Sequence, residues 1–187
     1  GGTVVRLGSV ASDATGAWSI TSAVPLADGT YTIQAVSAST TTWANGSYAF
    51  TTPLVIDTVG PRIWAVTAAP LSSRLSVSLR DFGGSADSGS GIDLTRARDA
   101  ASYIFATSTG AARPISSIIV SPGSTNGVQT VNLTFGSRIV DGAYLLTVLS
   151  SAGRAYGIQD IAGNPLDGPF TGTFPSGGSN TRGDFRA

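Results

Sequence analysis

Five residue types are missing from this sequence: cysteine, histidine, methionine, lysine and glutamate. Without histidine or cysteine the chain has no imidazole base, no thiolate nucleophile and no soft ligand for zinc. All its acids are Asp and all its bases are Arg, and 11 of each give a formal net charge of zero. The arginines are scattered rather than gathered in a basic stripe, and no segment approaches the ~20 apolar residues of a membrane span. We therefore expect a protein that is not an enzyme, has no nucleic-acid partner and has no membrane span.

The most informative feature that is present occurs twice. An Asp-Gly turn leads into a strand-like segment with an early tyrosine, in residues 26–33 and again in residues 139–146. The residues concerned are Asp28, Gly29 and Tyr31 in the first copy and Asp141, Gly142 and Tyr144 in the second. A tyrosine at this position can fold back and donate a hydrogen bond to the preceding loop, which is typical of the tyrosine corner of Greek-key sandwiches. The copies lie roughly 110 residues apart, close to one Ig-type module of ~100 residues with longer loops, so they predict two modules in tandem.

Short alternating or β-branched segments, interrupted by Gly, Asp, Ser or Pro, predict an all-β chain. The fold class that we expect is two Ig-like antiparallel β-sandwiches in tandem. In the first part, strands are predicted at residues 3–7, 18–21, 30–36 and 48–56. In the second part they are predicted at residues 62–67, 74–79, 103–106, 115–120, 128–135, 144–149 and 170–173. Only residues 94–101 look helical, with Asp93 as the N-cap.

A Gly-Pro pair at residues 60–61 marks the junction between the two parts. We expect residues 1–57 to be the C-terminal part of one Ig-like module, residues 58–175 to be a complete module, and residues 176–187 to be a flexible tail or linker. In a seven-strand module the corner tyrosine opens the sixth strand; Tyr144 follows five predicted strands, but Tyr31 follows only two. The first module therefore lacks its N-terminal strands, and strand addition from a neighbouring chain could complete it. An upstream piece of the same protein that stays bound, or an incomplete chain, would give the same pattern.

Several motifs of the first part resemble bacterial Ig-like repeats that are strung along large surface proteins and adhesins: DATGAW at 13–18, LADGTY at 26–31 and DTVGP at 57–61. The second part is similar to the related Ig-like modules of bacterial exoproteins, through SGIDL at 90–94, DGAY at 141–144 and GIQDIAGNPLDG at 157–168. The resemblance implies a non-catalytic structural or adhesive module of a bacterial cell-surface or extracellular fibre protein. Its partners would be neighbouring copies or modules of the same protein, and a surface glycan or host-cell ligand. The alternative is a carbohydrate-binding or spacer appendage of a secreted hydrolase.

The best candidate for a site is the turn at residues 160–167, which contains Asp160, Asn164 and Asp167. Calcium takes several oxygen ligands on a flexible loop, and these side chains offer them together with nearby backbone carbonyls. The resemblance implies the same cofactor, because related repeats often bind calcium through an Asp-x-x-Gly-Asn turn and the Asp of the following linker. The competing interpretation is that Asp160 and Asn164 form Asx-type turns that satisfy their own backbone, with Gly163 at positive φ.

Two weaker candidates remain. The acids between Asp81 and Asp93 superficially resemble a calcium loop, but glycines stand where ligands are needed, so an ordinary inter-strand loop is the better interpretation. Aromatic side chains could form a sugar-binding platform, since flat rings suit carbohydrates. Trp18 and Trp64 lie in strand-like segments, where core packing explains them, whereas Trp43 lies on a loop and is the candidate for ligand contact.

Overall fold

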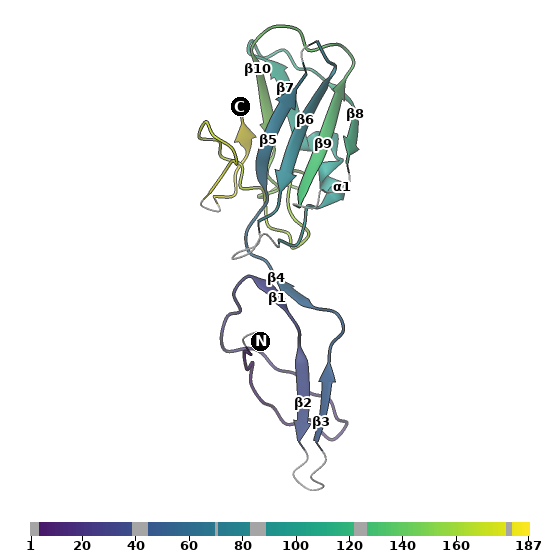
Figure 1. Cartoon of the computed structure of the whole chain (residues 1–187), viewed down its shortest axis with the longest axis vertical. Coiled ribbons are helices and arrows are strands. Elements are labelled where there is room, and N and C mark those ends of the chain that lie inside the picture. The colour runs from purple at the N-terminus through teal and green to yellow at the C-terminus, as the bar shows by residue number, and fades with distance from the viewer. Residues whose placement is uncertain (1–3, 39–44, 70, 83–88, 122–126, 179–180) are drawn as a thin grey trace.

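The computed structural model describes residues 4–38, 45–69, 71–82, 89–121, 127–178 and 181–187. Over these residues the chain is mostly β, with several small antiparallel sheets and one short α-helix. No helix in these ranges is long and apolar enough to cross a membrane. Figure 1 shows strands β1 to β4 at one end of the molecule and the other elements at the opposite end, joined by the chain that leads into β5.

The larger part contains two antiparallel sheets, one of four strands in the order β5-β6-β9-β8 and one of three in the order β11-β10-β7. The bounds of these strands are β5 Arg62–Ala68, β6 Arg74–Arg80, β7 Tyr103–Thr107, β8 Ile115–Val120, β9 Val128–Phe135, β10 Tyr144–Val148 and β11 Phe185–Arg186. Strands β5 to β10 are found where the sequence predicts them, because each contains β-branched or aromatic residues, and polarity also alternates along β6 and most of β9.

Side chains alternate in direction along each central strand, and those on one face lie in a common core. In β6 the side chains of Leu75, Val77 and Leu79 are buried while their neighbours are partly buried or exposed, because successive side chains of a strand point to opposite faces. The second sheet contributes Phe105 of β7 to the same cluster, and its ring centroid lies 4.8 Å from that of Phe135 in β9. Side chains from the two sheets therefore meet in one hydrophobic core.

The predicted helix is present but shorter than expected. Helix α1 covers Leu94–Ala97, and the Asp93 side chain accepts hydrogen bonds from the N–H groups of Thr95 and Arg96, so the predicted N-cap is confirmed. The chain then forms the 3₁₀ turn η1 (Ala100–Ser102), whose own cap is Asp99. The Asp99 side chain accepts a hydrogen bond from the backbone of the next turn, which competes with continuation of the α-helix. The predicted helix at residues 94–101 is therefore divided into α1 and η1.

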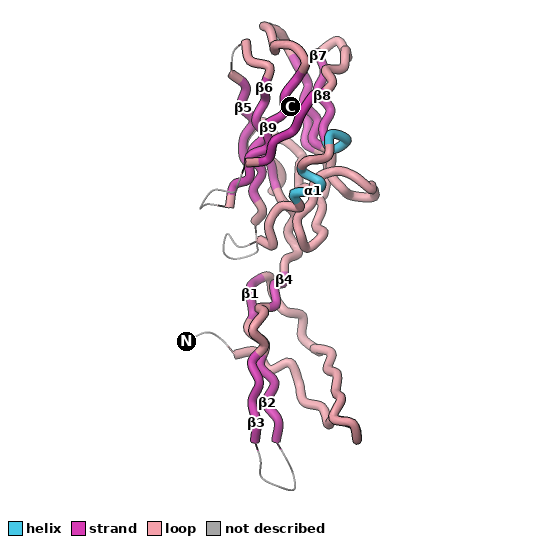
Figure 2. The backbone as a smooth tube through the Cα atoms, turned by 90° about the vertical axis from the view of Figure 1, so that its right-hand side faces the viewer, coloured by secondary structure: helices cyan, strands magenta, loops and turns pink. Residues whose placement is uncertain are grey.

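The smaller part consists of two two-stranded antiparallel ladders (Figure 2). The pairs are β1 (Gly29–Tyr31) with β4 (Leu54–Ile56), and β2 (Gln34–Ala38) with β3 (Asn45–Ala49). Each of the strands predicted at residues 30–36 and 48–56 is therefore divided into two shorter strands.

The two earliest strand predictions are wrong, because residues 4–7 and 18–21 form no strand in the structure. Alternation alone does not make a strand: backbone groups need a neighbouring strand to pair with, and the described part of the chain offers these segments none. Trp18 is 51% exposed, so the core position expected for it is also wrong.

The C-terminal segment packs against the larger part, contrary to the expectation of a flexible tail over residues 176–187. Phe185 is completely buried, and β11 pairs with β10 through Val148 and Phe185. The ring centroid of Phe185 lies 5.1 Å from that of Phe170 and 6.1 Å from that of Phe174. The strand predicted at residues 170–173 is not formed, because this stretch contributes its aromatic side chains to that small cluster instead of pairing its backbone.

Candidate cation site

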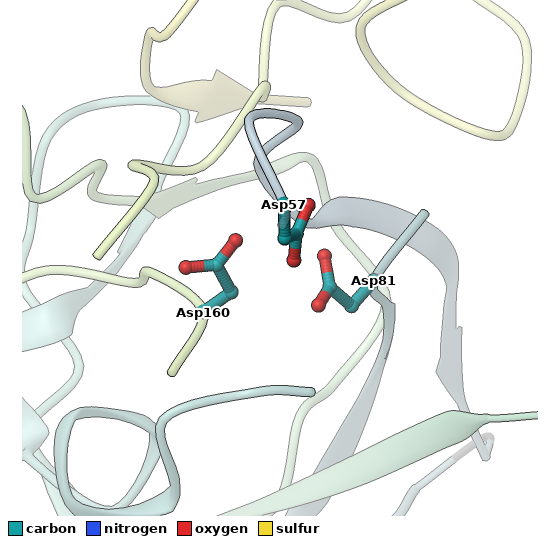
Figure 3. A group of neighbouring side chains, drawn as sticks. All are labelled: Asp57, Asp81 and Asp160. Carbon is teal, nitrogen blue, oxygen red and sulfur yellow. The ribbon is translucent and has the colours of Figure 1, made fainter. Parts of the chain in front are cut away.

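Three buried aspartates from distant parts of the sequence converge beside the junction (Figure 3). Asp57 lies in the linker before β5, Asp81 directly follows β6, and Asp160 opens the turn at residues 160–164. One carboxylate oxygen from each lies within 4.8 Å of the other two. The group, called the Asp57–Asp81–Asp160 cluster below, could hold a metal ion.

Local turn structure fixes Asp160. Its Oδ1 accepts a hydrogen bond from the backbone N–H of Asn164 (2.7 Å), and its Oδ2 accepts one from the Asn164 side-chain amide (2.7 Å). Gly163 has a φ of 91°, which a residue without a Cβ adopts readily. The Asx-type turn of the competing interpretation is therefore present. The same amide donates to the backbone carbonyl of Asp57 (2.9 Å), so the turn also holds the linker.

The linker approaches this turn so closely that it needs a glycine. A Cβ placed on Gly60 would lie 1.9 Å from the carbonyl oxygen of Pro165. The Asp57 carboxylate is oriented by two backbone donors, Val59 N–H at 3.2 Å and Ser90 N–H at 2.6 Å. Asp57 is thus fixed to elements of the larger part.

Asp81 is the residue whose environment most clearly suits a cation. Its Oδ2 accepts a hydrogen bond from the Gly91 N–H (2.7 Å), while its buried Oδ1 has no hydrogen-bond partner among the described residues. A Cβ on Gly89 would lie 2.3 Å from the Asp81 carboxyl group, so the backbone closes over the side chain. A buried carboxylate oxygen without a partner is costly unless a ligand satisfies it.

The electrostatics agree with this geometry. The pKa of Asp81 is raised to about 7, mainly by burial and in addition by the neighbouring charges of Asp57 and Asp160, against the hydrogen bond from Gly91. Burial is also the main reason why the pKa of Asp160 is raised. Three carboxylates that are crowded and shielded from water repel one another, and a bound cation removes that repulsion.

The donor set selects a hard cation. Carboxylate oxygens are the ligands that calcium takes, typically six to eight oxygens at about 2.3–2.6 Å, whereas zinc prefers nitrogen and sulfur. With no histidine or cysteine in the sequence, the three aspartates fit calcium. Asp57, Asp81 and Asp160 would hold the ion, and Asn164 would keep Asp160 and the linker in place.

The structure separates the three residues predicted from the turn. Asp160 belongs to the cluster and Asn164 orients it, but Asp167 lies outside the cluster. The carboxylate of Asp167 accepts hydrogen bonds from Gly178 (2.9 Å) and from the N–H and hydroxyl of Thr181 (3.0 and 2.8 Å). Burial raises the pKa of Asp167, but these bonds and the nearby Arg62 outweigh it and leave the pKa below its ordinary value.

Sequence reasoning missed two members of the cluster. The sequence interpretation places Asp81 in an ordinary inter-strand loop, and it does not include Asp57 among the candidate ligands. A usable signal was present for these two residues: Asp57 directly follows β4 and Asp81 directly follows β6, and loop ends gather at one edge of a β structure. That signal does not reveal which loop ends share an edge.

The two predicted corners have matching geometry. The Tyr31 hydroxyl donates to the carbonyl of Ala27 (2.8 Å), and the Tyr144 hydroxyl donates to that of Val140 (3.1 Å), in each case four residues upstream. The glycines of the two turns have φ values of 154° and 159°. A Cβ on either glycine would lie 3.7 or 3.6 Å from its tyrosine ring, so the rings pack over the two turns in the same way.

The two predicted Asp-Gly aspartates differ in their surroundings. Asp28 accepts hydrogen bonds from the Thr58 hydroxyl at 2.9 and 3.0 Å, and this threonine directly follows Asp57 of the cluster. Asp141 is exposed on its loop. The first corner is therefore linked through one residue to the Asp57–Asp81–Asp160 cluster.

The structure bears on two of the three tryptophans considered for ligand contact, Trp18 and Trp64. Trp43 lies outside the described residues. Trp64 is 37% exposed rather than in the core, which corrects the expectation for it, and the Arg80 guanidinium lies 4.9 Å from its ring centroid. Ile63 faces the core and successive side chains of a strand point to opposite faces, so Trp64 points outward, toward Arg80 and Phe82.

Comparisons with known proteins found no matching family model, curated protein or solved structure. The features of the chain itself that bear on its function are its two matching corners and the Asp57–Asp81–Asp160 cluster.

Proposed function

We propose that this chain is a non-catalytic structural or adhesive module of a bacterial cell-surface or extracellular fibre protein, held in shape by calcium. In this proposal residues 58–175 form an Ig-like sandwich and residues 1–57 form the C-terminal part of another. The shared core of the two sheets and the matching tyrosine corners support that reading. Asp57, Asp81 and Asp160 bind the ion.

One observation carries the proposal: the cluster combines an aspartate of the linker with two aspartates of the larger part. A cation bound there would fix the linker to the larger part. Thr58, the next residue, reaches Asp28 of the first corner, so the ion would also restrict how the smaller part is oriented. Rigid junctions of this kind suit a stalk or fibre, in which modules must transmit position over a distance.

The extracellular location follows from the chemistry of the proposed cofactor. Sites with few charged ligands on extracellular modules typically bind calcium with dissociation constants of about 10⁻⁴–10⁻³ M, and so need the calcium concentrations found outside cells. The absence of cysteine removes disulfides as a means of stabilisation and leaves the metal that role.

A distance measurement across the junction tests this function. Because the chain has no cysteine, nitroxide labels can be placed on Thr30→Cys and Ser108→Cys, two exposed positions in the smaller and larger parts. We expect a narrow distribution of spin–spin distances with calcium and a broad one with chelator. Asp81→Asn in the labelled chain should give the broad distribution in both conditions, whereas the matched Asp141→Asn, at an exposed site, should behave as the parent does. Equal widths with calcium and with chelator would rule out the proposed role of the ion.

A further inference from the structure

The dipeptide Asp-Gly occurs three times in the chain, at residues 28–29, 141–142 and 167–168. After an aspartate, a glycine nitrogen is the main-chain nitrogen that attacks the carboxyl group most easily, because glycine has no Cβ to obstruct the close approach. Such an attack closes an imide ring, and hydrolysis of this ring can leave the main chain running through the aspartate side chain, as isoaspartate. Each copy follows an apolar residue, so the local sequences are alike and the fold decides which copy can react.

The third copy is fixed on both sides of the reacting bond. Asp167 is completely buried, and its carboxylate accepts hydrogen bonds from Gly178 at 2.9 Å and from Thr181 at 3.0 and 2.8 Å. The N–H of Gly168, which would be the attacking group, donates to the Gly183 carbonyl at 3.0 Å. The carboxyl group and the nitrogen therefore cannot turn toward each other without breaking these hydrogen bonds.

The first copy is restrained by one threonine and by a strand. The Thr58 hydroxyl lies within hydrogen-bond distance of both carboxylate oxygens of Asp28, at 2.9 and 3.0 Å. Gly29 is the first residue of β1 and pairs with Ile56 of β4, so its backbone belongs to a ladder. Side chain and main chain are both held away from the geometry that the attack needs.

The second copy has neither restraint. Asp141 and Gly142 are exposed, lie outside the strands, and have no hydrogen-bond partner among the described residues. Backbone–backbone hydrogen bonds anchor the loop at Ile139 and at Ala143, on either side of this pair. The first and second corners otherwise match, with glycine φ values of 154° and 159°, so the restraints on the first copy are what distinguishes them.

We propose that the Asp141–Gly142 bond is a site of spontaneous isomerisation in the folded chain, and that the Thr58 hydroxyl protects the equivalent bond of the first corner. The Gly142 nitrogen forms a bond to Cγ of the protonated Asp141 carboxyl group, which loses hydroxide. The hydroxide and the proton of the nitrogen leave as water. A second water molecule opens the imide at either carbonyl, and opening at the original peptide carbonyl gives isoaspartate.

The product changes the second corner. Isoaspartate adds one atom to the main chain between Val140 and Tyr144, the residues whose 3.1 Å hydrogen bond closes the corner. The modified corner therefore cannot keep its present geometry. Isomerisation at this bond needs neither calcium nor a partner chain, so its test can fail without affecting the proposed function.

Incubation of the folded full chain in heavy-oxygen water at neutral pH tests the site, because each hydrolysis of an imide adds one heavy oxygen to the residue. Digestion with trypsin in ordinary water then cleaves after Arg and places the three copies on separate peptides, 7–62, 139–154 and 155–182. We expect the peptide 139–154, whose only acidic side chain is Asp141, to gain heavy oxygen and to separate into two chromatographic forms. Uptake at Asp28 and Asp167, located by fragmentation, should be at least about tenfold slower. No uptake in the peptide 139–154, or equal uptake at the three copies, would overturn the proposal.

The chain unfolded in urea is the first control. Without the restraints of the fold, the three copies should take up heavy oxygen at similar rates. A preference for Asp141 that persists in urea would mean that the local sequence selects this copy, which contradicts the proposal. Asp141→Glu, at an exposed position, would have to close a larger ring and should end the uptake in the peptide 139–154. Uptake that continues in this variant would show that it does not come from an imide.

Variants of Thr58 test the protection of the first corner. Thr58→Val removes the hydroxyl and should raise the uptake at Asp28 at least about tenfold, while the uptake at Asp141 stays as in the parent chain. Thr58→Ser keeps the hydroxyl and is the matched control, with uptake at Asp28 as slow as in the parent. Equally slow uptake at Asp28 in both variants would overturn the role proposed for Thr58.

Discussion

At the scale of single residues, the cation site depends most on Asp81. Its Oδ1 is buried without a hydrogen-bond partner in the described structure, and its pKa of about 7 results from burial and from two neighbouring carboxylates. Asp57 and Asp160, in contrast, are each oriented by two hydrogen bonds. Removing the Asp81 carboxylate should therefore affect ion binding while leaving the linker and the turn in position.

The raised pKa of Asp81 predicts an unusual pH dependence of stability. Without calcium, we expect the free energy of unfolding to fall as the pH rises from about 4 to about 7. The folded protein keeps the Asp81 proton up to a pKa of about 7, whereas in the unfolded chain the group has its ordinary value of 3.8. Between these values the folded state binds more protons than the unfolded state, so a higher pH favours unfolding. Urea unfolding in chelator at about pH 5 and about pH 7.5 measures the change.

Calcium should reverse that trend, because the ion binds only the deprotonated carboxylates. Its stabilising effect is expected to be small at about pH 5 and to increase toward about pH 7.5. In chelator, Asp81→Asn should reduce the change in the free energy of unfolding between about pH 5 and about pH 7.5. A free energy of unfolding that rises steadily over this range in chelator would show that the pKa of Asp81 is not raised.

The corner tyrosines give a second prediction at this scale. Tyr31→Phe and Tyr144→Phe each remove a hydroxyl that donates to a carbonyl four residues upstream. Losing one such hydrogen bond typically costs about 1 kcal/mol. Tyr144→Phe should lower the free energy of unfolding by that amount in urea melts, and Tyr31→Phe should speed amide exchange in the loop before β1. Tyr156→Phe, at an exposed position, is the control and should be neutral.

At the scale of elements, the junction is held by the close contact between the linker and the turn at residues 160–164. Gly60 lies against the carbonyl of Pro165, and the Asn164 amide reaches the carbonyl of Asp57. Neither element is a helix or a strand, so their positions depend on these few contacts. The Asp57–Asp81–Asp160 cluster is thus assembled by packing of loops rather than by the sheets.

Gly60→Ala tests that packing. The added Cβ would meet the Pro165 carbonyl at 1.9 Å, so the linker must move away. Overpacking of this kind costs about 1–3 kcal/mol, and the displaced Asp57 should also weaken calcium binding. Gly136→Ala is the matched control, because a Cβ there has nothing within 4 Å. Thermal melts with and without calcium would measure both effects, and an unchanged response in Gly60→Ala would contradict the proposed linker packing.

The C-terminal strand is a second element that can be tested. Phe185→Ala removes a completely buried ring from the cluster with Phe170 and Phe174, and should cost about 3–5 kcal/mol. Phe174→Ala, at a residue 42% exposed, should cost clearly less. If urea unfolding shows similar decreases in the free energy of unfolding for the two variants, β11 contributes little to the stability of the fold.

The helices and strands also show how much of the fold could be predicted from the sequence alone. Strands β5 to β10 and the Asp93 cap could be predicted, because alternation, β-branched residues and capping act locally. Strand β11 could not, since two residues carry no period. Asp160 and Asn164 could be predicted as site residues, because they lie in one local turn. Asp81 could not, because its position in the cluster depends on which distant loops meet.

At the scale of the whole molecule, the two parts differ in completeness. The larger part buries a core drawn from both of its sheets, whereas the smaller part exposes apolar side chains on β2 and β3. The Asp57–Asp81–Asp160 cluster lies where the two are joined and draws one ligand from the linker itself. We propose above all that calcium binds there and stabilises the junction.

Calorimetric titration of the full chain with calcium tests this claim most directly. We expect one site with a dissociation constant of about 0.1–1 mM in the parent chain and in Asp141→Asn, and binding at least about tenfold weaker in Asp81→Asn. No binding to the parent chain, or equal binding by Asp81→Asn, would contradict the claim.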